Sequence, residues 1–143
     1  MKLITRDIDY AVRAICYIAR KNGSVVAVNE LVRCLKVPRP YIRKILQKLN
    51  KSGILSSIKG KGGGFRLGMK TGRIEMAGLI EVFGGPIRLS EHKFKKKACK
   101  EIKRCPLKKK LDYLERYIVA QLKQMDMETL LSEGERVGWQ GFG

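Results

Sequence analysis

The run of residues 59–67, KGKGGGFRL, carries groups that could hold a phosphate backbone. Three consecutive glycines stand between two short apolar segments whose β-branched and aromatic residues are typical of strands. Glycine accepts positive φ and has no side chain to keep another backbone at a distance. The run therefore predicts a two-stranded hairpin with a basic tip at Lys59, Lys61 and Arg66, able to follow a phosphate backbone or enter a minor groove.

A second group of chemically able residues precedes the last third of the chain. His92, Cys99 and Cys105 lie around seven Lys or Arg residues that fall between Lys93 and Arg104. Nearby cations lower thiol pKa values, which favours both metal ligation and reaction with oxidants. Two thiols and one imidazole also make a partial zinc site. The residue types leave these chemistries open, together with a loop that only adds basic charge.

Three helices are predicted in front of the glycine run. Apolar residues at helical spacing indicate helices over residues 5–21, 29–35 and 40–51, with a turn at 37–40 between the last two. The third helix is apolar at Ile42, Ile45, Leu46 and Leu49, and its other face carries Tyr41, Arg43, Lys44, Gln47 and Lys48. Two short helices joined by a tight turn, the second basic on one face, indicate a helix-turn-helix, and the hairpin adds a wing.

The C-terminal half is predicted to contain a helix over residues 74–85 and the longest helix of the chain over 106–125. The long helix has an apolar stripe at spacings of 4, 3, 4, 4 and 3, formed by Leu107, Leu111, Leu114, Ile118, Leu122 and Met125. This stripe is close to a heptad seam. It could pack on its own domain, but the winged domain has a core of its own, which favours a helix from a second subunit.

The predicted fold is therefore mainly α: a winged helix-turn-helix with a two-stranded wing and a long C-terminal dimerisation helix. Residues 1–73 form the DNA-binding domain in this prediction. Residues 74–131 hold a helix, the basic loop and the long helix, with a short helix at 128–131. Residues 132–143 show no core pattern and are expected to be a mobile tail.

Composition limits the function. The 143 residues include 31 Lys or Arg against 13 acidic residues, a net charge of +18, which favours nucleic acid as the partner and an anionic membrane surface second. No apolar run approaches the roughly 20 residues that span a bilayer, and the N-terminus is unlike a signal peptide. A cytoplasmic protein with reduced thiols is expected. With one histidine and no phosphate loop opening a helix, an enzyme is not expected.

Several segments together resemble the Rrf-type winged-helix regulators, the family of IscR, NsrR and CymR. The matching residues are DYAVRA at 9–14, Val37-Pro38, Tyr41-Ile42, Ile45-Leu46, LNKSGIL at 49–55, the glycine run at 59–67, Ile74-Glu75 and residues 79–84. The resemblance extends over about residues 1–131. It implies a homodimer, joined through the long helix, that reads a roughly palindromic operator in double-stranded DNA, with repression as the expected role.

The resemblance also implies which residues meet DNA. The basic helix would enter the major groove with Arg39, Pro40, Tyr41, Arg43, Lys44 and Gln47, and the wing would enter the minor groove with Lys59, Lys61, Gly62 and Gly63. Arg and Lys can bond the major-groove acceptors of guanine. Most of the affinity is expected from phosphate contacts and should fall steeply with salt.

For the sensor, the resemblance is incomplete. Family members that hold an iron–sulfur cluster have three cysteines before the long helix, where this chain has Cys99 and Cys105. His92 is the nearest replacement for the missing cysteine, and Lys108 stands where a cluster-holding member has histidine. Asp9 matches an acidic ligand near the N-terminus of another member. Cys99, Cys105, His92 and Asp9 could therefore bind a two-iron two-sulfur cluster.

Other interpretations remain open. The loop could be a cluster-free redox sensor with free thiols, a zinc site, or a segment that no longer senses anything. The chain could also be a cluster-free regulator controlled by a metabolic enzyme or other protein partner that docks on the long helix and the loop. A general nucleic-acid binder, driven by charge alone, would show no preference between an operator and a scrambled duplex.

Overall fold

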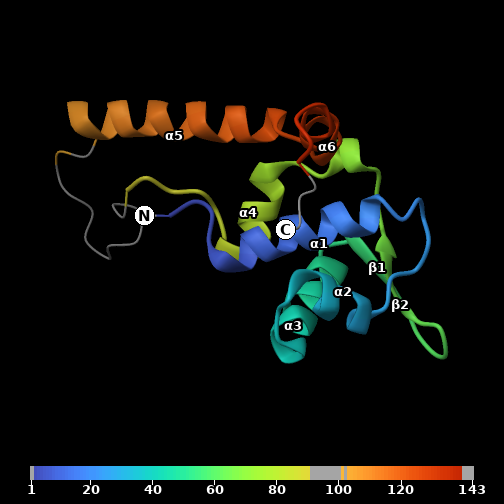
Figure 1. Ribbon diagram of the computed structural model, residues 1–143. Coiled ribbons are helices and arrows are strands. Elements are labelled where there is room, and N and C mark those ends of the chain that lie inside the picture. The colour runs from blue at the N-terminus through green and yellow to red at the C-terminus, as the bar shows by residue number, and fades with distance from the viewer. Residues whose placement is uncertain (1, 91–100, 102, 140–143) are drawn as a thin grey trace.

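The computed structural model describes residues 2–90, 101 and 103–139. Figure 1 shows a long helix that crosses the top of the molecule, with the hairpin and the helices of the N-terminal part below it. In chain order the elements are α1 (Arg6–Ala19), α2 (Val28–Leu35), α3 (Arg39–Lys51), β1 (Leu55–Ile58), β2 (Gly64–Leu67), the 3-10 turn η1 (Thr71–Arg73), α4 (Met76–Gly84), α5 (Pro106–Gln124) and α6 (Met127–Arg136). The predicted mainly α fold with a two-stranded wing is confirmed.

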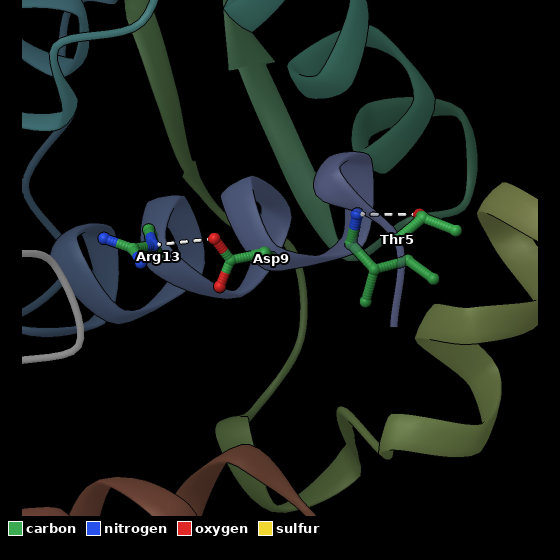
Figure 2. A network of polar contacts seen from close by, with 4 residues as sticks. Thr5, Asp9 and Arg13 are labelled. Carbon is green, nitrogen blue, oxygen red and sulfur yellow. Dashed lines mark hydrogen bonds and ion pairs between the residues drawn. The ribbon is translucent and has the colours of Figure 1, made fainter. Parts of the chain in front are cut away.

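Helix α1 begins with a side-chain cap. The backbone N–H of Ile8 donates to Thr5 Oγ1 at 3.4 Å, and acidic residues in the first turn suit the positive end of the helix dipole. One turn further on, Arg13 Nε donates to Asp9 Oδ2 at 3.0 Å (Figure 2). The opposite face of α1 is buried in the core, so the cap and the ion pair occupy the side that the core leaves free.

The turn between α2 and α3 has the geometry of a helix-turn-helix. Lys36 ends α2 in the left-handed conformation with φ 55°, and Val37 follows as a buried residue. Helix α3 then begins at Arg39, one residue before the predicted start, with proline in its first turn. The turn therefore sets the direction in which the exposed side of α3 faces, relative to the helical body formed by α1 to α4.

The wing is tied to the body by a residue that precedes α2. Strands β1 and β2 pair antiparallel, with Leu55 opposite Leu67. Val26 and Phe65 form a further bridge, in which the Val26 N–H donates to the Phe65 carbonyl at 2.8 Å and the Phe65 N–H donates to the Val26 carbonyl at 2.9 Å. A Cβ on Gly64 would lie 2.2 Å from the Val26 carbonyl oxygen, so only glycine fits there.

The long helix is fastened at its C-terminal end. The N–H of Met76 donates to the Met125 carbonyl at 2.8 Å, and the N–H of Met127 donates to the Ile74 carbonyl at 2.9 Å. Helix α4 lies between α1 and α5 (Figure 1) and packs against both. The segment that leaves the wing is thus joined directly to the junction of α5 and α6.

One hydrophobic cluster forms the interior. It takes residues from α1, α2, α3, β1 and α4, together with Met127 at the start of α6. Residues on both sides of position 73 share this core. The predicted boundary between a DNA-binding part (1–73) and a second part (74–131) therefore does not separate two cores, and it stays a prediction about function. No helix within the described ranges is both long and apolar enough to cross a membrane.

The predicted C-terminal tail of residues 132–143 is wrong for its first part, because α6 continues to Arg136. Trp139 then turns back onto this helix, and its N–H donates to the Gly134 carbonyl at 2.8 Å. A Cβ on Gly134 would lie 2.3 Å from the Trp139 ring, so the glycine makes room for the indole. Arg20 Nη2 also donates to the Trp139 carbonyl at 3.0 Å. Residues 140–143 of the predicted tail lie outside the described residues.

Candidate nucleic-acid interface

The outer face of α3 brings together five of the six residues predicted to meet DNA from this helix. They surround a shallow hollow of about 320 Å³ and are Arg39, Pro40, Arg43, Lys44 and Gln47. All five are exposed. The opposite face of α3 is buried at Ile42, Ile45, Leu46 and Leu49. Burial of one face therefore fixes the other toward solvent, as the spacing predicted.

Tyr41 is the residue that the structure does not bring to this hollow. Its hydroxyl donates to the carboxylate of Asp7, and its ring meets Tyr10 edge-on with 5.7 Å between ring centroids. The hydrogen bond to Asp7 raises the pKa of Tyr41. Tyr41 thus joins α3 to the first turn of α1. Residues two positions apart on a helix point in different directions, so Tyr41 faces away from the hollow that Arg43 lines. The predicted grouping did not take this spacing into account.

The wing presents its predicted lysines at the tip. Lys59 and Lys61 are exposed on the turn between β1 and β2. Gly62 adopts φ 74°, which favours glycine, and a Cβ on Gly63 would lie 2.3 Å from the Ile58 carbonyl oxygen. Gly62 and Gly63 therefore make the tight turn that carries the two lysines.

A cleft of about 330 Å³ separates the wing from the helices. It is lined by the start of α2, the start of α3 and the hairpin: Ala27, Val28, Asn29, Arg39, Ser57, Ile58, Gly60, Gly63, Gly64 and Phe65. At its edge Arg39 Nη1 donates to Asn29 Oδ1 at 2.5 Å. Sequence reasoning missed Asn29, because only the geometry of the turn shows that residues ten positions apart meet here.

Within the described part of the chain, no carboxylate forms an ion pair with Arg39, Arg43, Lys44, Lys59 or Lys61. Other cations do have carboxylate partners, among them Arg13 with Asp9 at 3.0 Å, Lys21 with Glu30 at 3.2 Å, and Lys108 with Asp112. The positive charge on α3 and the wing is therefore not compensated by ion pairs, which suits a polyanion.

Lys48 behaves differently from its basic neighbours on α3. It is half-buried, and its ammonium lies 5.3 Å from the ring centroid of Phe83 in α4. This cation–π contact joins α3 to α4. Lys48 is therefore part of the body, although the sequence pattern grouped it with the basic face.

The predicted metal ligands are only partly within the described residues. Asp9 is paired with Arg13, and Cys105 is half-buried just before α5. His92 and Cys99 lie outside the described residues. Among residues 2–90, 101 and 103–139, no three His, Cys, Asp or Glu side chains come together as a metal site. The two described ligands alone fit neither an iron–sulfur cluster nor zinc.

Helix α5 divides the predicted dimer stripe into two rows. Leu111, Ile118 and Leu122 are half-buried by this chain. Leu107, Leu114 and Met125 are 61%, 47% and 45% exposed. No residue of α5 is fully buried, although the helix has 19 residues. The inner row thus belongs to this chain, whereas the outer row is uncovered.

Two exposed tyrosines extend the uncovered side of α5. Tyr113 and Tyr117 are 61% and 54% exposed, one turn apart. Tyr113 and Leu114 line an apolar hollow of about 370 Å³ with the stems of Lys109 and Lys110. The heptad stripe did not include the tyrosines, since they fall outside its spacing.

Comparison with protein families gives one match over most of the chain. Residues 4–133 match the family model described as "Rrf2: Iron-dependent Transcriptional regulator". An HTH-type transcriptional regulator of Aquifex aeolicus is 34% identical over 82 residues, 57% of either chain. Protein aau3 of Rhizobium meliloti is 28% identical over 88 residues, 62% of this chain and 57% of that protein. The chain thus spans less than two thirds of these curated relatives.

Solved structures share the fold over nearly the whole chain. CymR, the global cysteine regulator of B. subtilis, superposes with a TM-score of 0.69 at 22% identity, covering 93% of this chain and 98% of its own. IscR of T. potens gives a TM-score of 0.71 at 19% identity, with coverages of 96% and 90%. At these identities the likeness shows the fold alone.

Proposed function

This chain belongs to the Rrf2 family of transcription regulators, and we propose that it binds double-stranded DNA as a homodimer at a roughly palindromic operator. Its family is one of regulators and not of enzymes, in agreement with the absence of a catalytic pattern from the sequence. The observation that carries the proposal is the uncompensated charge on α3 and the wing. A surface of this kind suits the phosphates of a duplex.

In this proposal α3 is the recognition helix. Arg43 and Lys44 reach out from the middle of its free face, where a bidentate contact to guanine is available to Arg. Gln47, one turn later on the same face, has the amide that pairs with adenine. The buried side of α3 holds the helix in place, so these side chains meet the groove from a fixed support.

The wing contributes charge and close approach. Lys59 and Lys61 stand at its tip, and the neighbouring glycines carry no side chains that would keep the backbone away from DNA. Phosphate contacts of this sort carry little sequence information. We assign sequence preference to α3, and affinity with its salt dependence to the wing and to Arg39.

The proposed second copy covers α5. The outer row Leu107, Leu114 and Met125, together with Tyr113 and Tyr117, leaves an apolar face that this chain does not bury. Faces of this kind mark interaction sites, and a two-fold contact between identical helices is self-complementary. A two-fold dimer presents two recognition helices and therefore favours a palindromic operator. Repression then requires only that the bound dimer occupies a promoter.

Selection of duplexes from a random library by the wild-type protein tests the DNA assignment. We expect an enriched sequence, and Arg43→Ala should reduce discrimination against a scrambled duplex by about fivefold to 100-fold. Arg136→Ala, which removes the same charge from the end of α6, should change neither. A wild-type protein that enriches no sequence would sink the proposal, and an Arg43→Ala variant with full discrimination would show that α3 is misassigned.

Sedimentation equilibrium tests the dimer. Leu114→Glu places a charge in the outer row of α5, and we expect monomers at concentrations where the wild type is dimeric. Ser132→Glu places the same charge on an exposed position of α6 and should leave the dimer intact. Equal behaviour of the two variants would assign the subunit contact to another surface.

The signal is proposed to act through residues 87–105, with iron as the first candidate because the family model is described as iron-dependent. Anaerobic purification with iron, sulfide and zinc assays separates the alternatives. Iron and sulfide that disappear in Cys99→Ala and Cys105→Ala support a two-iron two-sulfur cluster. A metal-free wild type supports a cluster-free regulator controlled by a docked protein. Zinc without iron or sulfide supports a zinc site in the loop.

A further inference from the structure

The cleft between α2 and the wing has one charged side chain among the residues that line it. Arg39 is this residue, and the rest of the lining is apolar, glycine, or neutral and polar. Two of the glycines, Gly63 and Gly64, leave backbone at the wall of the cleft. The cleft thus combines a single cation with otherwise uncharged walls.

Asn29 holds Arg39 without neutralising it. The amide oxygen of Asn29 accepts one hydrogen bond from Arg39 Nη1 at 2.5 Å. A guanidinium has five N–H donors, so four remain for another acceptor. The paired cations Arg13 and Lys21 have carboxylates as partners instead. Asn29 therefore fixes the direction of the guanidinium and leaves its charge available.

The surroundings of Arg39 favour an anion from outside the chain. Arg39 is the first residue of α3, where the positive end of the helix dipole disfavours a cation. The acid nearest in sequence to Asn29 is Glu30, which accepts from the Tyr17 hydroxyl at 2.5 Å and pairs with Lys21. Hydrogen bonding by Tyr17 lowers the pKa of Glu30, in keeping with a carboxylate engaged there. Its charge is thus committed away from Arg39.

From these contacts we propose that Asn29 is a positioning residue for DNA binding, which holds the Arg39 guanidinium at the mouth of the cleft for a backbone phosphate. The inference rests on the proposed function and adds a residue that lies on neither the recognition helix nor the wing. An Arg fixed before binding loses less rotamer freedom when the phosphate arrives. The contact contributes affinity on any sequence, because a phosphate carries no base identity.

Two substitutions at Asn29 separate positioning from structure. Asn29→Ala removes the hold on Arg39, and we expect affinity to fall about threefold to tenfold on enriched and scrambled duplexes alike. Asn29→Asp gives Arg39 a carboxylate that neutralises it, so affinity should fall further and the salt slope should decrease by about one. The added acid in the first turn of α2 favours the helix dipole, so the melting temperature should stay equal or rise. If Asn29 were only structural, its substitution would lower the melting temperature and the DNA affinity together.

A double-mutant cycle with Arg39→Ala completes the test. Fluorescence anisotropy at a series of KCl concentrations, starting at low salt, gives the affinity of the full chain and of each variant for the enriched and the scrambled duplex. We expect Asn29→Ala to have no effect once Arg39 is alanine. Equal weakening in both backgrounds, or wild-type affinity in Asn29→Asp, would overturn the inference. A wild type without any sequence preference would instead refute the proposed function, which keeps the two failures distinct.

Discussion

Helices α3 and α5 have similar sequence patterns and opposite relations to the rest of the chain. Each combines an apolar stripe with a basic side, and each is identified by its periodicity. In α3, four apolar residues are buried among 13 positions, whereas none of the 19 residues of α5 is fully buried. The interior uses the apolar side of α3 and leaves much of α5 exposed. A periodic stripe therefore predicts a helix but not the surface that covers it.

The largest expected contrast is between Leu46 of α3 and Leu114 of α5, which are 0% and 47% exposed. Leu46→Ala leaves a cavity in the core and should lower the free energy of unfolding by about 2–5 kcal/mol at every protein concentration. Leu114→Ala should change the unfolding of the dilute protein by less than about 0.5 kcal/mol. Its effect should grow with concentration, since it weakens the dimer. Urea unfolding over a concentration series measures both.

If Leu114→Ala destabilised the dilute protein as much as Leu46→Ala, the contrast between the two helices would fail. If neither effect depended on concentration, α5 would have no role in association under these conditions. Sedimentation of the same samples gives the oligomeric state that each unfolding curve refers to.

A second prediction asks whether the wing shares the stability of α3. Gly64→Ala brings a methyl group against the Val26 carbonyl, and we expect a loss of about 1–3 kcal/mol in the free energy of unfolding. Hydrogen exchange at the amides of Val26 and Phe65 should also become faster. Gly78→Ala is the matched control, because it adds the same methyl group on an open side of α4 and should stabilise by roughly 0.5–1 kcal/mol.

Unchanged exchange at Val26 and Phe65 in Gly64→Ala would mean that the wing moves independently of the body. The lysines at its tip would then meet DNA from a flexible support, in contrast to those of α3. Global stability equal to that of the wild type would support the same reading.

The smallest expected effect concerns thiol reactivity in the body and on the surface. Burial raises the pKa of the Cys16 thiol to about 11, whereas Cys34 on α2 is exposed. The raised pKa makes the thiolate of Cys16 roughly 100-fold scarcer at pH 8 than that of an ordinary cysteine. Maleimide labelling followed by peptide mass spectrometry should therefore modify Cys34 long before Cys16. Similar rates would show that α1 opens readily, against the packing described for the body.

Much of the fold could be predicted from the sequence, because a helix with one buried face shows it locally in the spacing of its apolar residues. The spacing of Ile42, Ile45, Leu46 and Leu49 predicts both α3 and its exposed basic side. The Val26–Phe65 bridge had no such signal, since a single paired residue shows no periodicity. Trp139 was also missed, because one indole against a glycine makes a contact without a pattern.

The candidate site could be predicted where the position of a side chain depends only on its own helix. Arg43 and Lys44 could be assigned to the surface from spacing, because nothing in the described chain competes for them. Tyr41 and Arg39 are different, since each is directed by a partner on another helix: Asp7 for Tyr41 and Asn29 for Arg39. Such pairs depend on how helices cross, which a single sequence does not contain. The division of α5 into an inner and an outer row is hidden for the same reason.

The two backbone hydrogen bonds between residues 74–76 and 125–127 have a consequence for operator architecture. They join the end of α5 to the segment that follows β2, with only η1 and its flanking residues between. In the proposed dimer, the crossing angle of the two α5 helices therefore sets the separation of the two wings as well as that of the recognition helices. Any event that rotates one α5 against the other would change the half-site spacing that the protein accepts, while every contact within a half-site stays the same.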